Sequence, residues 1–368
     1  MKSKKIKVLH FTQANSGGID TYLRMYLKYS NVDVFSNILV TTGENKFSNL
    51  DGFYHVDIRQ TFSPIKLFKY ACNIRKIIKA EKPDIIYLHS TFGGLVGRMA
   101  NIGLKSKVVY NPHGWSFKMN VSKKKIFIYK LVEKVLSYLT DKFILISKSE
   151  YEEAKKIGIS ANKLELVYNG IDLENLDTSI NKDNKEEILP KDRYIIGMIG
   201  RIAEQKNPLF FVDFAKEVLK KFPETLFVIV GDGELRMQVE SRIAEYNISK
   251  NFLITGWVSE PSNYLRWFDQ AVLFSKWEGL SLAAAEYMAM KKPIIVSNIG
   301  GLVDLIINKE SGFTINNLNE AVYYSQLIRE NRIMCDSLSS NAYNRVINNF
   351  NVKDKTAEIE QIFINLVK

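Results

Sequence analysis

Cysteine is scarce in this chain of 368 residues, with only Cys72 and Cys335, each inside a helical pattern. A fold held by disulfides is therefore excluded, and a reduced, cytosolic protein is expected. No apolar run approaches the roughly 18 residues that a membrane-spanning helix needs. The N-terminal segment is short and polar, so it does not resemble the apolar core of a secretory signal.

Several site motifs are also missing. No phosphate loop of the Walker A type occurs, and Gly231-x-Gly233 has Arg236 where a dinucleotide fingerprint requires its third glycine. The four histidines are scattered and there is no Asp-x-Asp pair, so no metal site is expected. Nicotinamide chemistry and metal-assisted chemistry are therefore disfavoured.

Acidic residues are scarce in the first half of the chain only. Residues 1–180 contain 28 Lys and Arg against 16 Asp and Glu, a net charge of +12, whereas residues 181–368 have a net charge of −1. This asymmetry suits nucleic acid, an anionic membrane surface or a phosphate-bearing substrate, or it provides a solubilising surface. The aromatic and basic platform of a nucleic-acid-binding module is absent, so we expect no nucleic-acid partner.

Strand and helix patterns alternate along residues 1–171 and again along residues 193–351. Such alternation predicts an α/β protein with two Rossmann-like, doubly wound domains. Residues 172–192 are polar and lack periodicity, which makes them the predicted linker. The C-terminal helix, residues 352–368, can pack back on the first domain. Loops that follow parallel strands would then line a cleft between the domains.

The most informative stretch is residues 275–289. An apolar strand pattern at 270–274 precedes it, and Ala, Leu and Met give strong helix propensity after Leu282. A strand, a glycine-containing loop and a helix together form a seat for phosphate, because N–H groups and the positive end of the helix dipole converge there. Glu278 and Glu286 bracket this seat and would accept hydrogen bonds from sugar hydroxyls.

A second loop, residues 200–207, also follows a predicted strand. Arg201 and Lys206 lie five positions apart within it, a pair of cations that suits a diphosphate. The alternative is a basic loop that is merely solvated. Gly17-Gly18 follows the first strand and is either another anion loop or an ordinary turn.

Two helical segments in the basic half carry both lysines and apolar residues. In residues 121–139 the apolar positions repeat at three- and four-residue spacing; they are Ile128, Leu131, Val132, Val135 and Leu139. Residues 64–80 show a similar pattern that includes Ile65 and Phe68. Such a helix either lies on an anionic bilayer or packs its apolar side on the core and exposes its lysines.

These motifs, taken in order, resemble glycosyltransferase family 4. The resemblance rests on the following residues: Gly17-Gly18, His113-Gly114, Asn169-Gly170, Gly200-Arg201, Gln205-Lys206-Asn207, Gly231-Asp232-Gly233, Gly256-Trp257, Glu278 with Glu286, and Gly300-Gly301. It covers almost the whole chain and is strongest over 195–305. It implies a retaining, metal-independent glycosyltransferase (hexosyltransferase) of the GT-B fold, in which two Rossmann-like domains face each other across a cleft.

The resemblance also implies a role for each matched residue. Arg201 and Lys206 would neutralise the diphosphate of the sugar donor, and Glu286 would hold its ribose. The transferred sugar would contact Glu278 and His113 at the reacting end. Backbone groups would approach the donor at Gly17, Gly18, Gly279, Leu280, Ser281 and Leu282. Asp20 replaces the family's usual glutamate, and the segment after Gly279 lacks the common proline, so the sugar is not predicted.

The expected reaction moves a hexose or N-acetylhexosamine from a nucleoside-diphosphate sugar, UDP-linked in our prediction, to a sugar hydroxyl. The basic half favours a lipid-diphosphate-linked acceptor, as in capsule or exopolysaccharide assembly, and a location at the cytoplasmic face of the plasma membrane. No cofactor other than the nucleotide sugar is expected. Transfer to a soluble acceptor and epimerisation of a sugar nucleotide remain as alternatives.

Overall fold

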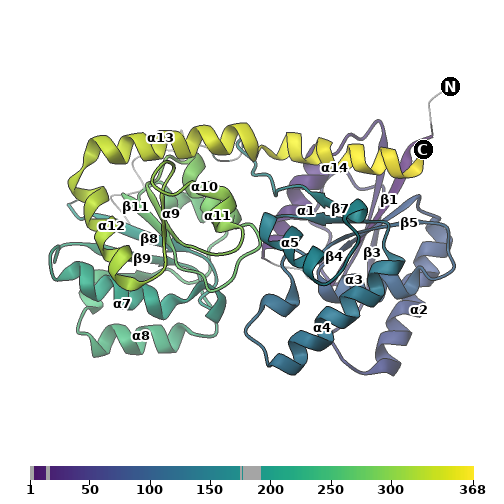
Figure 1. Cartoon of the computed structure of the whole chain (residues 1–368), viewed down its shortest axis with the longest axis horizontal. Helices are drawn as coiled ribbons and strands as arrows, with labels where there is room; N and C mark the ends of the chain where they lie inside the picture. The colour runs from purple at the N-terminus through teal and green to yellow at the C-terminus, as the bar shows by residue number, and fades with distance from the viewer. Residues whose placement is uncertain (1–3, 14–16, 175, 177–191) are drawn as a thin grey trace. The chain divides into compact units, whose positions relative to one another are not determined.

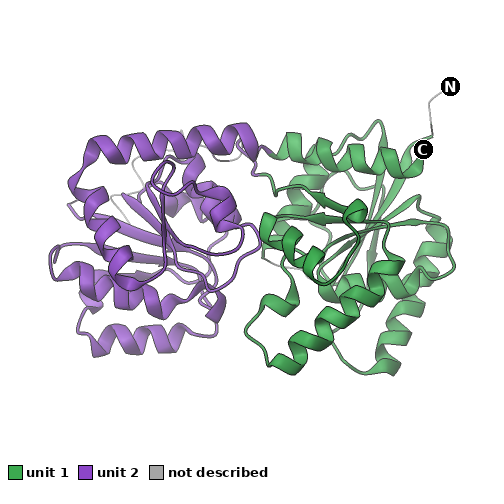
Figure 2. Cartoon of the chain, viewed as in Figure 1, with its two compact units in different colours: residues 1–170, 352–368 green, residues 171–351 purple. Residues whose placement is uncertain are grey.

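The computed structural model describes residues 4–13, 17–174, 176 and 192–368. The chain forms two compact units, residues 1–170 with 352–368 and residues 171–351 (Figure 2). Each unit is built on one parallel sheet. Most of the predicted linker, residues 175 and 177–191, lies outside the described residues.

Unit 1 contains a seven-stranded sheet in the order β3-β2-β1-β4-β5-β6-β7 (Figure 1). The chain adds strands outward from β1 in one direction and then returns to place β4 on its other side. The carboxyl ends of β1 and β4 therefore flank a switch point, where ligands bind in open α/β sheets. The strands are β1 (Ile6–Thr12), β2 (Phe35–Thr41), β3 (Gly52–His55), β4 (Ile85–His89), β5 (Lys107–Asn111), β6 (Lys142–Leu145) and β7 (Leu164–Leu166).

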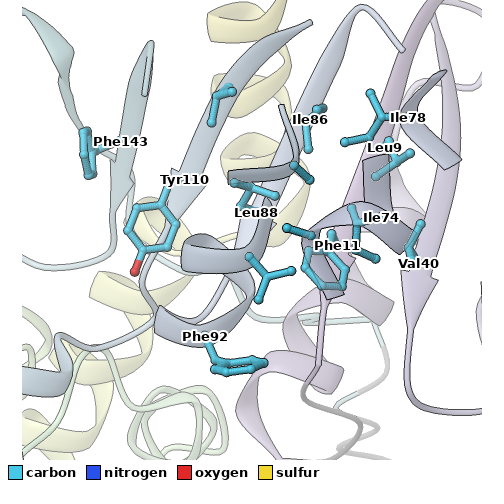
Figure 3. Packing of buried hydrophobic residues seen from close by; sticks show 14 of the residues in the cluster. Leu9, Phe11, Val40, Ile74, Ile78, Ile86, Leu88, Phe92, Tyr110 and Phe143 are labelled. Atoms are coloured by element: carbon cyan, nitrogen blue, oxygen red, sulfur yellow. The ribbon is translucent and has the colours of Figure 1, made fainter. Parts of the chain in front are cut away.

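Helices cover both faces of this sheet, so its central strands are apolar on both sides. One core contains alternate strand residues, such as Leu9 and Leu88, together with residues from α2 and α3 (Figure 3). The opposite core holds Val8 and Tyr87 with residues from α1 and α14. The helices are α1 (Gly18–Tyr29), α2 (Pro64–Glu81), α3 (Thr91–Ala100), α4 (Lys123–Leu136), α5 (Lys148–Lys156) and α14 (Val352–Val367).

Helix α3 lies unusually close to the sheet because it carries glycines on its inner side. A Cβ atom on Gly94 would lie 2.4 Å from the ring of Tyr110, and one on Gly97 would lie 2.2 Å from Leu88. Gly93 and Gly94 both lie within this helix. Their function is close packing rather than a turn.

Helix α14, at the end of the chain, belongs to unit 1. Ile359 and Phe363 are buried in the core shared with α1. The Glu360 carboxylate accepts hydrogen bonds from Ser30 Oγ at 2.8 Å and from the Asn31 N–H at 2.9 Å. The C-terminal helix thus completes the first unit.

Helix α4 differs from the core-facing interpretation of its sequence pattern. Ile128, Leu131 and Val135 are between 52 and 55% exposed, and Leu139, just beyond the helix, is also exposed. The side turned toward the core instead includes Tyr129 and the buried Glu133. Ile65 and Phe68 of α2 are likewise exposed. The core-facing interpretation is therefore wrong for these apolar residues.

Unit 2 contains a six-stranded parallel sheet in the order β10-β9-β8-β11-β12-β13. Its main core combines strand residues with apolar residues of α7, α8 and α12. The strands are β8 (Ile195–Ile199), β9 (Leu226–Val230), β10 (Phe252–Ile254), β11 (Gln270–Leu273), β12 (Ile294–Ser297) and β13 (Phe313–Ile315). The helices are α7 (Pro208–Leu219), α8 (Arg236–Glu245), α9 (Ser262–Leu265), α10 (Leu282–Ala289), α11 (Leu302–Leu305), α12 (Leu318–Glu330) and α13 (Arg332–Asn349).

None of the helices in the described ranges combines the length and the apolar character that crossing a bilayer requires.

Candidate active site

Two loops of unit 2 meet at the carboxyl ends of the neighbouring strands β8 and β11. Lys206 ends a short 3-10 helix in the loop after β8, and its ammonium lies 2.5 Å from Glu278 Oε1 in the loop after β11. The side chains are 15 and 7% exposed. Two residues that the sequence predicted for one site are thus in direct contact.

Further hydrogen bonds fix the two loops to each other. The Gln205 side chain donates to the carbonyl of Trp277 at 3.2 Å, and the Lys276 N–H donates to the carbonyl of Gln205 at 2.8 Å. Ser275 Oγ donates to Glu278 Oε1 at 2.8 Å. Glu278 Oε2 has no hydrogen-bond partner within the described residues, so this oxygen is available to a ligand.

The loop after β11 leads directly into α10. Ser281 caps this helix, and its Oγ accepts a hydrogen bond from the Ala284 N–H at 3.4 Å. The N–H groups of the first turn, including that of Leu282, have no acceptor within an α-helix. Gly279 and Leu282 are half-buried, whereas Leu280 and Ser281 are buried. The helix therefore directs its positive end and several N–H donors toward the segment that begins at Glu278.

The glycine pair after β12 allows a third loop to pack on this segment. A Cβ atom on Gly300 would lie 2.3 Å from the carbonyl oxygen of Glu278, and one on Gly301 would lie 1.6 Å from that of Gly279. Gly300 also has a φ of 44°, which disfavours a side chain. Only glycines fit these two positions without moving the loop that carries Glu278.

Glu286 lies in the second turn of α10 and is half-buried. Burial raises the pKa of its carboxyl to about 7. Its carboxylate has no hydrogen-bond partner in the part of the chain that the structure describes. The neighbouring Tyr287 accepts a hydrogen bond from the Ile199 N–H at 2.6 Å, and burial, together with the charges of Glu286 and Glu278, raises the pKa of Tyr287. Both carboxylates therefore lie near the end of β8.

Arg201 follows β8 but does not join the Lys206–Glu278 pair. Its side chain is 70% exposed, and its Nε lies 3.9 Å from Glu234 Oε2. An exposed pair of this kind is weak. The guanidinium is therefore free to turn toward an anionic ligand.

In unit 1, the predicted residues also follow strands. Gly17 has a φ of 74° and precedes α1, which begins at Gly18. Among the described residues, and apart from the chain neighbours, no atom lies within 4 Å of a Cβ built on either glycine. Asp20, which stands where the family has glutamate, forms an ion pair with Arg24 on the exposed side of α1. Asn15 and Ser16 lie outside the described residues.

His113 follows β5 and has a φ of 52°. Its N–H donates to Asn111 Oδ1 at 2.9 Å, and its Nε2 lies 3.0 Å from Nδ1 of His89. Burial lowers the pKa of His113 to about 3. The contact with His89 was not predicted from the sequence. The signal for this contact is that the strands ending at His89 and Asn111 are neighbours in register.

Within the described residues, no group of three or more His, Cys, Asp or Glu side chains is arranged to hold a metal ion.

Comparison with known proteins identifies the family. The family described as "Glycosyltransferase Family 4" matches residues 26–175, and "Glycosyl transferases group 1" matches residues 179–345. An Escherichia coli protein named UDP-Gal:alpha-D-GlcNAc-diphosphoundecaprenol alpha-1,3-galactosyltransferase is 32% identical, over 86% of this chain and 84% of its own length. This chain belongs to the family 4 glycosyltransferases.

Several solved structures have the same fold as this chain. A sucrose-phosphate synthase from Thermosynechococcus elongatus gives a TM-score of 0.85 at 20% identity and covers 98% of this chain and 99% of its own. The Anabaena protein HepE, solved with UDP and glucose, gives 0.84 at 16% identity and covers 97% and 99%. The predicted GT-B fold and the enzyme class, a glycosyltransferase of EC 2.4, are therefore confirmed. The roles of individual residues stay predictions.

Proposed function

We propose that this glycosyltransferase moves a hexose or N-acetylhexosamine from a UDP-sugar to a sugar hydroxyl of a lipid-diphosphate-linked acceptor during the assembly of a cell-surface polysaccharide. The contact between Lys206 and Glu278, at the N-terminus of α10, is the observation that carries the donor side of this proposal. The name of the E. coli relative supports the acceptor class, and that of a Staphylococcus aureus capsular polysaccharide biosynthesis glycosyltransferase, 24% identical, supports a role in polysaccharide assembly.

The donor side follows from the charges of unit 2. Lys206, Arg201 and the positive end of α10 neutralise the diphosphate, so we propose that no metal ion is needed there. Glu278 forms an ion pair with the Lys206 ammonium in the structure. When a diphosphate binds that ammonium, Glu278 accepts hydrogen bonds from the sugar hydroxyls. Glu286 accepts those of the ribose.

The reaction retains the configuration at the anomeric carbon. The bond between that carbon and the phosphate oxygen breaks, and its electron pair leaves with UDP. The acceptor hydroxyl oxygen forms the new bond from the same face, and its proton passes to the departing phosphate oxygen. The transition state resembles an oxocarbenium ion. The cations that hold the diphosphate stabilise the negative charge that grows on it as it leaves.

The acceptor side follows from an exposed surface of unit 1, which we call the apolar–lysine surface. Its apolar part comprises Phe62, Ile65 and Phe68 around the start of α2, and Phe127, Ile128, Leu131, Val135 and Tyr138 along and just after α4. Its basic part comprises the exposed Lys66, Lys69, Lys123, Lys124 and Lys125. Each of the two helices thus exposes several large apolar side chains, and exposed apolar patches often mark interaction sites.

The position of this surface fits a membrane-bound acceptor. Helix α3 packs against α2, and Arg98 of α3 binds Glu133 of α4, so α2 and α4 flank α3 in one layer (Figure 1). In parallel α/β units a helix begins at the carboxyl edge of the sheet. The starts of α2 and α4 therefore lie at the edge where His113 and Gly17 are found. We propose that an anionic bilayer covers the apolar–lysine surface, with apolar side chains inserted and lysines at the headgroups.

Co-sedimentation with vesicles tests the membrane part of the proposal. The enzyme is expected to bind vesicles that contain anionic lipid and to bind neutral vesicles far less. Replacing Ile128, Leu131 and Val135 together with Ser should abolish that binding, whereas the control Ile333→Ser, which alters an exposed apolar residue of unit 2, should not. Equal binding of the triple variant and the wild type would refute this docking surface.

Product analysis separates the proposed transfer from epimerisation. An epimerase would convert the nucleotide sugar in the absence of any acceptor, whereas a transferase leaves a new glycosidic bond on the acceptor. Transfer to a water-soluble analogue of the acceptor, at the same rate with and without vesicles, would favour a soluble acceptor instead.

A further inference from the structure

Three of the chain's four histidines lie in one cluster of unit 1. The ring centroids of His10 and His89 are 5.7 Å apart, those of His89 and His113 are 5.3 Å apart, and both pairs are stacked. His10 and His89 are fully buried, whereas His113 is only half-buried, at the edge of the sheet. Of these three, the family resemblance gives only His113 a role, at the transferred sugar.

We infer that His89 is a positioning residue that holds His113 as the neutral tautomer with its proton on Nδ1, so that His113 offers an N–H donor to the substrate. This inference rests on the proposed function in one respect, that the transferred sugar lies at His113, as the family resemblance implies. The tautomer itself follows from contacts inside unit 1.

The hydrogen bond between His89 Nδ1 and His113 Nε2 uses one proton, which leaves two arrangements. If His113 were the donor, the proton of neutral His89 would lie on Nε2, which is buried without a partner in the described structure. Buried N–H groups without an acceptor are rare, and each costs about 1–3 kcal/mol. The favoured arrangement has His89 Nδ1–H donating to the lone pair of His113 Nε2.

His113 then carries its proton on Nδ1, because a neutral imidazole has only one. Burial lowers the pKa of both rings, and the charge of His113 further lowers that of His89, so a doubly protonated His113 is disfavoured at neutral pH. His113 Nδ1 has no partner among the described residues and lies on the ring edge opposite His89. A substrate oxygen can therefore accept a hydrogen bond from it.

The surrounding groups keep the cluster free of charge. Asn37 donates its amide to Ser30 Oγ at 2.9 Å, so its oxygen accepts the proton on His10 Nε2 at 3.1 Å. Burial lowers the pKa of His10 to about 4. The tyrosines packed on the rings have raised pKa values because of burial, and they are Tyr22, Tyr26 and Tyr87. In the described structure no carboxylate contacts His89, so none draws its proton away from Nδ1.

The ring of His113 is also restricted in orientation. Its backbone is fixed by Asn111, and the ring edge meets Tyr22 with centroids 4.6 Å apart. The Tyr22 hydroxyl lies 2.6 Å from that of Tyr87, which anchors it. Among the described residues, the contact with His89 alone decides which nitrogen of His113 carries the proton.

Two substitutions of similar size separate the hydrogen bond from packing. In His89→Asn the amide N–H occupies the position of Nδ1–H, whereas His89→Leu fills the space without a donor. Uniform ¹⁵N labelling reports the tautomer directly, and four histidines give few signals to assign. We expect His113 to carry its proton on Nδ1 in the wild type and in His89→Asn, and to shift toward the Nε2 tautomer in His89→Leu. Thermal unfolding of both variants checks that the fold persists.

Activity provides the second readout. Loss of an orienting partner of this kind costs about 10- to 100-fold, so kcat should fall by that factor in His89→Leu and should recover in His89→Asn. A wild-type His113 with its proton on Nε2, or a folded His89→Leu that keeps both the tautomer and kcat, overturns the inference. A wild type that transfers no sugar counts against the proposed function, while the spectrum still tests the tautomer.

Discussion

The Lys206 ammonium lies 2.5 Å from a carboxylate oxygen of Glu278, although 72 residues separate them in the chain. Their loops end the strands β8 and β11, which are neighbours in the sheet. The pair is largely buried, so a charge left alone there would be costly. If Glu278 turned away, a bound diphosphate could replace it as the anion beside Lys206, so that the Lys206 charge would not be left alone.

Lys206→Ala should weaken donor binding and turnover for any UDP-sugar. Removing a charged donor to the diphosphate is expected to lower kcat/KM by about 100- to 1,000-fold. Calorimetric titration with UDP and initial rates measure the two effects. Lys276→Ala is the matched control, since Lys276 forms only an exposed pair with Glu204 at 3.3 Å. Equal losses in the two variants would contradict the role of Lys206.

Donor affinity should rise as the pH increases through 7. The free protein holds Glu286 with a pKa of about 7, above its ordinary value, because of burial. Its ionised form accepts hydrogen bonds from the ribose hydroxyls better than its protonated form does. UDP-galactose is a suitable probe because its diphosphate has no further proton to lose in this range. Glu286→Gln should remove the pH dependence of binding, and an unchanged pH profile would refute the ribose assignment.

The Glu286 carboxyl should also make the stability of the folded protein depend on pH, but stability should fall as the pH rises, whereas donor affinity should increase. The folded protein binds the Glu286 proton more tightly than the unfolded chain, so this group's contribution to the free energy of unfolding falls as the pH rises from about 4.5 to 7. Chemical denaturation of the wild type and Glu286→Gln should diverge over that interval. If the free energies of unfolding of the two proteins changed in parallel with pH, the Glu286 carboxyl would not have the raised pKa that its burial implies.

A buried ion pair in unit 1 should matter for stability but not for donor binding. Arg98 donates to Glu133 Oε2 at 2.9 Å and to the Gly94 carbonyl at 2.8 Å, and it stacks on Tyr110. Arg98→Met leaves a buried carboxylate alone and should cost about 3–5 kcal/mol. The double variant with Glu133→Leu should recover part of that loss. Denaturant unfolding measures both, with UDP affinity expected to stay unchanged.

Transfer activity should persist after chelation with EDTA. In our proposal, Lys206, Arg201 and the start of α10 supply the positive charge that a metal ion provides in other transferases. Rates measured with EDTA and with added Mg²⁺ should agree. Loss of activity in EDTA that Mg²⁺ restores would contradict metal independence.

Much of the geometry of the candidate donor site could be predicted from the sequence because its signals are local. A strand, a glycine-containing loop and a helix identified the phosphate seat, and Ser281 begins that helix as its cap. The contact between Lys206 and Glu278 required strand order as well. The packing of Gly300 and Gly301 on the Glu278 loop depends on tertiary structure that no local pattern encodes.

Helix α4 shows where periodicity fails. The spacing of Ile128, Leu131 and Val135 identified an amphipathic helix, but spacing alone does not say which side faces the core. The buried side carries Glu133, a residue that is rarely buried unless paired, and its partner Arg98 lies on another helix. His89 was missed as a partner of His113 because that partner, too, lies on a different element of the fold.

Transfer to a lipid-linked acceptor tests the account most directly. The protein is incubated with a panel of nucleotide sugars and GlcNAc-diphosphoundecaprenol, the acceptor in the name of the E. coli relative, or other lipid-linked saccharides, and the lipids are analysed by mass spectrometry. We predict an acceptor extended by one hexose or N-acetylhexosamine from a UDP-sugar, and greatly reduced extension with Lys206→Ala. A folded wild type that extends no lipid-linked acceptor, or that extends one equally well after Lys206→Ala, would contradict the account.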